Sequence, residues 1–163
     1  MTDTTPTPAP GDTATIRIAA PPSVVYGIIT DVAGMGRLSP ECTGGSWKGG
    51  ATGPAVGAVF KGTNKRGFVR WSTSNTVIAA ETDREFAFQT AQSGMAWRFT
   101  LTPDGDGTLV TESRAAFRSP PFIAKAFGAL ALGGLDSHAD ELRAGMVATL
   151  ERLKAVAEAE AGA

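Results

Sequence analysis

Cysteine and histidine are nearly absent from this chain of 163 residues, which contains only Cys42 and His138. A single thiol cannot form a disulfide within one chain. One Cys and one His also fall short of the three or four protein ligands that a zinc site needs. The sequence therefore excludes disulfides within the chain and predicts that the protein has no structural metal.

An excess of charge of one sign and a long apolar run are also missing. Lys and Arg number 15 and Asp and Glu number 16, whereas a nucleic-acid partner needs a basic face. The longest apolar stretch, 120–135, is interrupted by Lys125 and is too short to span a bilayer. Residues 1–14 have neither the basic start nor the apolar segment of a signal peptide. We therefore expect a cytoplasmic protein with no nucleic-acid partner and no integral membrane segment.

Glycine, in contrast, is plentiful between residues 39 and 57, at positions 44, 45, 49, 50, 53 and 57. A dinucleotide fingerprint needs glycines at i, i+2 and i+5 before a helix, and none of these positions has that spacing. Gly57 and Gly62 have the separation of a P-loop, but Thr63 takes the place of its lysine and a strand continues. The glycines thus indicate turns rather than a phosphate site, and we expect no cofactor.

The order of the expected elements indicates a single α+β domain over residues 14–160. Residues 1–13, rich in Thr and Pro, are expected to form a disordered tail. Short turns separate the strands in the middle of the chain, and connections this short permit only antiparallel neighbours. The expected strands are 14–20, a small one around Trp47, 55–63, 68–80, 84–91, 95–102 and 108–117, and the expected helices are 22–33, 121–132 and 137–159.

The helix expected over 137–159 has the clearest amphipathic pattern. Gly145 in its middle either allows close approach to the sheet or leaves room for a ligand. The apolar segment 119–135 before it, which includes Phe122 and Phe127, is either a lid over a cavity or a packed connector. The apolar stripe of the helix consists of Leu142, Met146, Leu150, Leu153 and Val156–Ala157.

The chain contains the stretches SPECTGG, ATGPAVGAVFKGTN, RWSTSNTV, REFAF and GMVATLERLKAVAE. These stretches resemble the bacterial SRPBCC, or START-like, superfamily of polyketide cyclase/dehydratase-like proteins. The resemblance extends over residues 14–159 and implies a helix-grip fold, in which a curved antiparallel sheet wraps around a long C-terminal helix and leaves an internal cavity. Members include lipid carriers, hormone receptors, aromatase/cyclases and ring-hydroxylating oxygenases. The oxygenases need several His ligands for iron, so the single His138 excludes that branch.

Eight residues are expected to line this cavity. Aromatic side chains alternate along the expected strands 84–91 and 95–102, and Trp71 lies among polar neighbours on 68–80. A mixed apolar and polar wall is typical of a ligand pocket, although the same alternation is typical of a packed core. The expected residues are Trp71, Thr73, Phe86, Phe88, Trp97, Phe99, Leu142 and Met146.

Charged strand residues and His138 form a second group of candidates. Strand charges are most often solvated, and one that points inward needs a partner or an anionic group. His138 lies in the first turn of a helix, where the positive helix end opposes its protonation and favours a surface role. Cys42 has no histidine base beside it in the sequence and is interpreted as structural. The candidates for a polar cavity wall or a lid are Arg70, Glu112, Arg114, Phe122, Phe127 and His138, and no residue is assigned a catalytic role.

The leading hypothesis is a monomeric or homodimeric protein that binds, and in one version transports, a small hydrophobic or aromatic ligand. The ligand would be lipid- or polyketide-like and would lie between the sheet and the last helix. No acid–base pair or metal site is evident in the sequence, which favours binding over catalysis. Two alternatives stay open: a cyclase or dehydratase that uses the same cavity, and a non-catalytic protein-interaction module that docks through residues 119–135.

Overall fold

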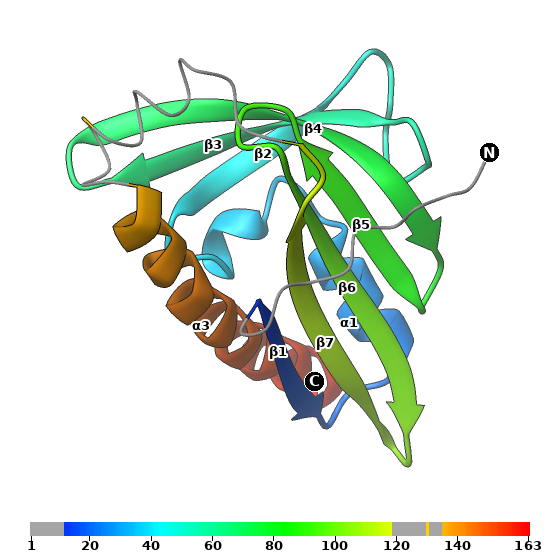
Figure 1. The fold of residues 1–163 in the computed structure, drawn as a ribbon. Helices are drawn as coiled ribbons and strands as arrows, with labels where there is room; N and C mark the ends of the chain where they lie inside the picture. Colours follow the sequence, from blue (N-terminus) through cyan, green and yellow to red (C-terminus); the bar gives the residue numbers. More distant parts are fainter. Residues whose placement is uncertain (1–11, 119–129, 131–134) are drawn as a thin grey trace.

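The computed structural model describes the backbone of residues 12–118, 130 and 135–163, and their side chains except those of 135–139 and 142. Seven strands form one antiparallel sheet in the order β1-β7-β6-β5-β4-β3-β2, and helix α3 runs along its concave side (Figure 1). The elements are β1 (Thr13–Ile18), α1 (Pro22–Ile29), the 3-10 helix η1 (Met35–Arg37), β2 (Cys42–Lys48), β3 (Val59–Arg66), β4 (Val69–Glu81), β5 (Glu85–Thr90), β6 (Met95–Asp104), β7 (Gly107–Ala116) and α3 (Leu135–Ala161).

Two of the expected segments lie largely outside the described residues. They are the tail expected over 1–13, apart from residues 12 and 13, and the helix expected over 121–132, apart from Leu130. Thr13, which was expected to lie in the tail, belongs instead to β1 and pairs with Ser113 of β7.

The middle of the chain is the antiparallel meander that its short turns predict. Strands β2 to β7 lie beside one another in chain order, and β1 pairs with β7 at the far edge. Gly67, Gly94 and Gly105 lie in the hairpin turns with φ angles of 60, 70 and 62°, a left-handed conformation that glycine adopts without steric penalty. The turn after β3 needs only Gly67 and Phe68, so the strand continues to Arg66 instead of ending at residue 63.

Helix α3 carries its predicted apolar stripe into the core. Met146, Leu150, Leu153 and Ala157 are all buried, and the helix packs against β1 and α1. This burial of one face supplies most of the stability of such a helix. No helix in the described part of the chain is long and apolar enough to cross a membrane.

Helix α1 is shorter than its hydrophobic pattern predicts. It begins at Pro22, a position where the missing N–H of proline costs nothing. It ends at Ile29 instead of residue 33, and the Thr30 hydroxyl donates to the carbonyl oxygen of Tyr26 at 2.7 Å. Val32 stays buried although it lies in the turn that follows the helix.

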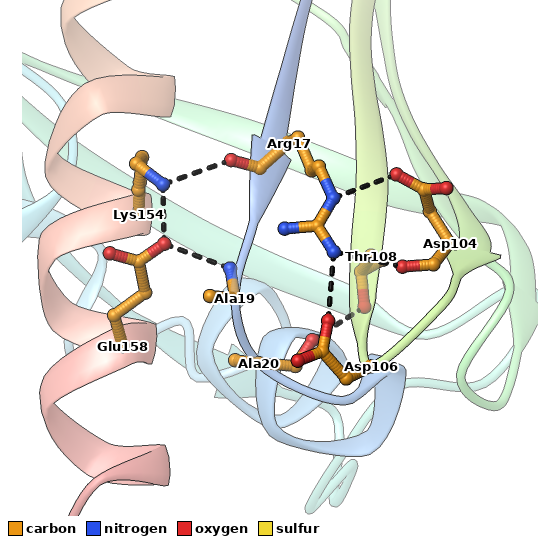
Figure 2. Close-up of polar contacts among 8 residues, drawn as sticks. All are labelled: Arg17, Ala19, Ala20, Asp104, Asp106, Thr108, Lys154 and Glu158. Atoms are coloured by element: carbon orange, nitrogen blue, oxygen red, sulfur yellow. Dashed lines mark hydrogen bonds and ion pairs between the residues drawn. The ribbon is translucent and has the colours of Figure 1, made fainter.

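Polar contacts fasten the C-terminal half of α3 to β1 (Figure 2). Lys154 Nζ donates to the carbonyl oxygen of Arg17 at 3.1 Å, and Glu158 Oε1 accepts from the backbone N–H of Ala19 at 2.8 Å. Arg17 in turn bonds Asp104 at 2.8 Å and Asp106 at 2.9 Å at the β6–β7 turn. These contacts hold one end of the helix to the sheet, and the hollow described below lies toward the other end.

Candidate ligand-binding cavity

A cavity of about 500 Å³ lies between the concave face of the sheet and the N-terminal half of α3. Each strand from β2 to β7 contributes to its wall, and Met146, Gly145 and Thr149 contribute from α3. Exposed lining residues gather at the β3–β4 turn and at Glu141, so this end of the cavity reaches the surface. The volume is within the range of pockets that hold small organic molecules.

The strand register places an aromatic cluster on the wall. Phe88 of β5 pairs with Trp97 of β6 and with Val77 of β4, and directly paired residues of antiparallel strands share one face of the sheet. Phe60 contacts Phe88 edge to face, with ring centroids 5.1 Å apart. Phe60, Trp71, Phe88, Trp97 and Phe99 all line the cavity.

A hydrogen-bonded row of polar side chains lies beside the aromatic cluster. Thr90 Oγ1 donates to Asn75 Oδ1 at 2.8 Å, and Asn75 Nδ2 donates to Thr73 Oγ1 at 3.1 Å. All three side chains line the cavity. Thr73 accepts in this row, and among the described residues its hydroxyl proton has no acceptor, so it can donate to a ligand.

Glu112 of β7 brings a carboxyl group into the cavity wall. The residue is 4 % exposed, and its Oε2 atom has no hydrogen-bond partner among the described residues. Burial disfavours the ionised form and raises the pKa of Glu112 to about 8. At neutral pH the group is therefore mostly a protonated acid, able to donate one hydrogen bond.

Glu41, Arg66 and Glu141 form a charged group at the open end of the cavity, which we call the rim cluster. Arg66 Nε donates to Glu141 Oε2 at 2.6 Å, and Arg66 Nη2 also contacts Glu141 Oε1. Burial, followed by the charge of Glu141, raises the pKa of Glu41 to about 7, against the lowering effect of Arg66. The cluster joins the β3–β4 end of the sheet to the first turns of α3.

Asp12, Arg114 and Arg143 form a second charged group beside the cavity, which links β7 to α3. Asp12 Oδ1 accepts from Arg114 Nη2 at 3.2 Å and from Arg143 Nε at 2.7 Å. Asp12 and Arg114 are both buried, and the Arg114 guanidinium lies 5.7 Å from the ring centroid of Trp97. Arg114 thus has an ionic partner and does not depend on an anionic ligand.

The sequence pattern of the family described as "Polyketide cyclase / dehydrase and lipid transport" matches residues 13–158. The chain belongs to this family. No curated protein matches the chain. The curved sheet and its gripped helix are therefore the helix-grip fold that the sequence resemblance predicts, which confirms that expectation.

Several solved structures resemble the chain over most of its length. The Polyketide_cyc-like protein Cgl2372 from Corynebacterium glutamicum is 29% identical, with a TM-score of 0.61 and 91% of each chain covered. The di-domain ARO/CYC StfQ from the steffimycin biosynthetic pathway is 14% identical, with a TM-score of 0.68 over 93% of this chain and 51% of that one. The major latex-like protein 151 from Panax ginseng is 13% identical, with a TM-score of 0.63 over 89% and 95% of the two chains. The last two likenesses show the fold alone.

The structure of this family member places at the cavity seven of the ten expected residues whose side chains it describes. Three lie elsewhere. Phe86 is fully buried in the core, Arg114 is buried against Asp12, and Arg70 is exposed because strand alternation turns it away from its neighbour Trp71. The side chains of Leu142 and His138, and the residues Phe122 and Phe127, lie outside the described part of the chain. The expected residues that line the cavity are Trp71, Thr73, Phe88, Trp97, Phe99, Met146 and Glu112.

For Glu112 and Arg114, the interpretation as solvated strand charges is wrong. Both side chains are buried because β7 lies inside the sheet, between β1 and β6, with this face toward the core. The partner of Arg114 could not be predicted from the sequence, since Asp12 precedes the first strand. The alternation of β7 did place Glu112 and Arg114 on one face.

Several wall residues were not among the candidates. Strand alternation places Asn75 on the same face of β4 as Trp71, and Thr90 on the same face of β5 as Phe88. Following the alternation further along each strand would therefore have predicted both residues. The only feature of the sequence that pointed to Glu41 and Cys42 was their position in an expected loop. Burial raises the pKa of the Cys42 thiol, which donates to the carbonyl oxygen of Gly44 at 3.6 Å, in keeping with its structural interpretation.

Proposed function

We propose that the protein binds a small, mainly apolar or aromatic organic molecule in the cavity beneath α3. The observation that carries the proposal is the cavity itself, about 500 Å³ of space lined by five aromatic side chains and Met146. Apolar ligand surface removed from water contributes about 25 cal/mol per Å² before ordering costs. The family description, which includes lipid transport, supports the same class of ligand.

The polar groups of the wall supply orientation to such a ligand. Thr73 and Glu112 come from β4 and β7, with β5 and β6 between them, so they address different parts of a bound molecule. A pocket with an apolar lining and a few placed polar groups is typical of small-molecule sites.

Native mass spectrometry of the protein purified from its own host tests the proposal. We expect a mass added to the chain that is released by denaturation and identified as a hydrophobic small molecule after extraction. A homogeneous, ligand-free protein that also fails to take up any of a panel of apolar aromatic compounds would contradict the proposal.

A cyclase- or dehydratase-type enzyme is the second candidate, favoured by one observation. Burial raises the pKa of Glu112 to about 8, within about one unit of neutral pH, and the residue lines the cavity, which suits a group that gives and takes protons. The discriminating result is turnover of an aromatic polyketide precursor that disappears in Glu112→Gln while ligand binding persists. The third candidate, a docking module, depends on Phe122 and Phe127, which lie outside the described residues.

A further inference from the structure

We propose that Glu112 donates a hydrogen bond to a carbonyl oxygen of the ligand and thereby selects ketone- or quinone-bearing ring systems over hydrocarbons of the same shape. This inference rests on the proposed function, because it requires the cavity to accept an apolar ring system. It adds to the proposed function a polar group that determines specificity, and it names the chemical class of the ligand.

The position of Glu112 carries the inference. Its register partners are Phe99 on β6 and Ala14 on β1, so apolar residues flank it on both neighbouring strands. The carboxyl group lines the cavity, is almost fully buried, and leaves Oε2 without a described hydrogen-bond partner. Buried polar groups nearly always have a partner, and here the space in which one would fit is the ligand cavity.

Burial favours the acid form of the Glu112 carboxyl, and the described cations nearby are engaged with other residues. Arg114 shares its strand face but is held by Asp12, which also binds Arg143 of α3. At the far end of the cavity, Arg66 of β3 is engaged with Glu141 of α3. In the described part of the chain no cation pairs with Glu112, and burial raises its pKa to about 8.

The protonation state defines the group that Glu112 recognises. A protonated carboxyl donates through its O–H, so its natural partner is an acceptor without a charge, such as a ketone or quinone oxygen. Among the residues that the structure describes, a ligand carboxylate would meet no free cation at this position, and an ammonium group would need the ionised form. The remaining wall near Glu112, with Trp97 and Phe99, matches the flat apolar body of a fused-ring ligand.

Fluorenone and fluorene provide a matched pair of probes, because they share one ring framework and differ by a carbonyl group in place of a methylene. Equilibrium dialysis at about pH 6.5, where the acid is protonated, measures the affinity of the wild type and two variants for each probe. We expect the wild type to bind fluorenone about fivefold or more tighter than fluorene. Glu112→Leu should lose this preference, whereas Glu112→Gln, which still has an N–H donor, should keep most of it.

The outcomes separate the two proposals. If the wild type binds both probes equally, or if Glu112→Leu keeps the preference, the inference is wrong while the proposed function stands. If neither probe binds to the wild type, the proposed function fails and the inference fails with it.

If Glu112→Leu does not fold, a pH series provides the test. The preference of the wild type for fluorenone should fall above about pH 8 as the acid ionises, while that of Glu112→Gln stays constant. A preference that is constant with pH in both proteins overturns the inference.

Discussion

Glu112 is a buried acid that affects stability and, in our proposal, ligand binding. A carboxyl group that lies in an apolar wall without a partner among the described residues costs free energy, and a well-packed core would have a hydrocarbon side chain in its place. Sites where a protein tolerates such a cost are often those where it binds or reacts. Asp12 presents the opposite case, because this buried acid has two arginines around it.

The pH dependence of stability should reveal this acid directly. The folded state holds the proton up to about pH 8, whereas the unfolded chain releases it near its ordinary value, about 4.5. Between these limits the folded state binds more protons, so Glu112 lowers the free energy of unfolding by about 1.4 kcal/mol for each pH unit of increase. Relative to Glu112→Gln, the wild type should therefore lose stability as the pH rises from about 5 to 7.5.

Urea unfolding of both proteins across this pH range checks the prediction. The difference between the two curves isolates Glu112, because all other titrating groups are common to both proteins. Parallel pH profiles would mean that the acid has its ordinary pKa and is not buried as the structure places it.

At the scale of elements, the C-terminal half of α3 packs on β1, whereas its N-terminal half lies across the cavity from the sheet and is joined to it by the ion pair of Arg66 with Glu141. Lys154 and Glu158 fix its C-terminal half to β1, while Gly145 in its N-terminal half lines the cavity. A Cβ atom added at Gly145 meets no described atom within 4 Å. Of the two explanations for this glycine, close approach to the sheet is thus wrong, and the open space favours room for a ligand.

Gly145→Leu should fill part of the cavity without unfolding the helix. Replacing a mid-helix glycine gains up to about 1 kcal/mol of helix propensity, so we expect unchanged or increased thermal stability. Affinity for fluorenone should fall about tenfold or more. Ala144→Leu is the matched control, since its exposed neighbouring position adds the same side chain outside the cavity. Equal loss of affinity in both variants would contradict the placement of the ligand.

Sequence patterns predicted the elements better than their assembly. Alternation along β5 and β6 predicted apolar stripes that include Phe88 and Trp97, the polar neighbours of Trp71 on β4 indicated a mixed wall, and short turns predicted the antiparallel order. Alternation gives no information on the distance between one face of the sheet and the helix opposite it. Phe86 in the packed core and Phe88 on the cavity wall therefore occupy equivalent positions in the sequence pattern. The contact of Asp12 with Arg143 joins the two ends of the chain, and no local pattern contains it.

At the scale of the whole molecule, the sheet wraps α3 without filling the space that it encloses. The fold followed from the family resemblance, whereas the cavity volume and its polar groups required coordinates. The cytoplasmic location, the absence of a nucleic-acid partner and the monomeric or dimeric state stay predictions from composition. The central claim is that the enclosed space is the place where a ligand binds.

Intermolecular NOEs between labelled protein and unlabelled fluorenone test that claim most directly. We predict that the aromatic protons of fluorenone contact the side chains of Phe88, Trp97 and Met146, all of which line the cavity. Bound fluorenone whose NOEs instead reach only exposed side chains, such as Phe68 at the β3–β4 turn, would contradict the claim.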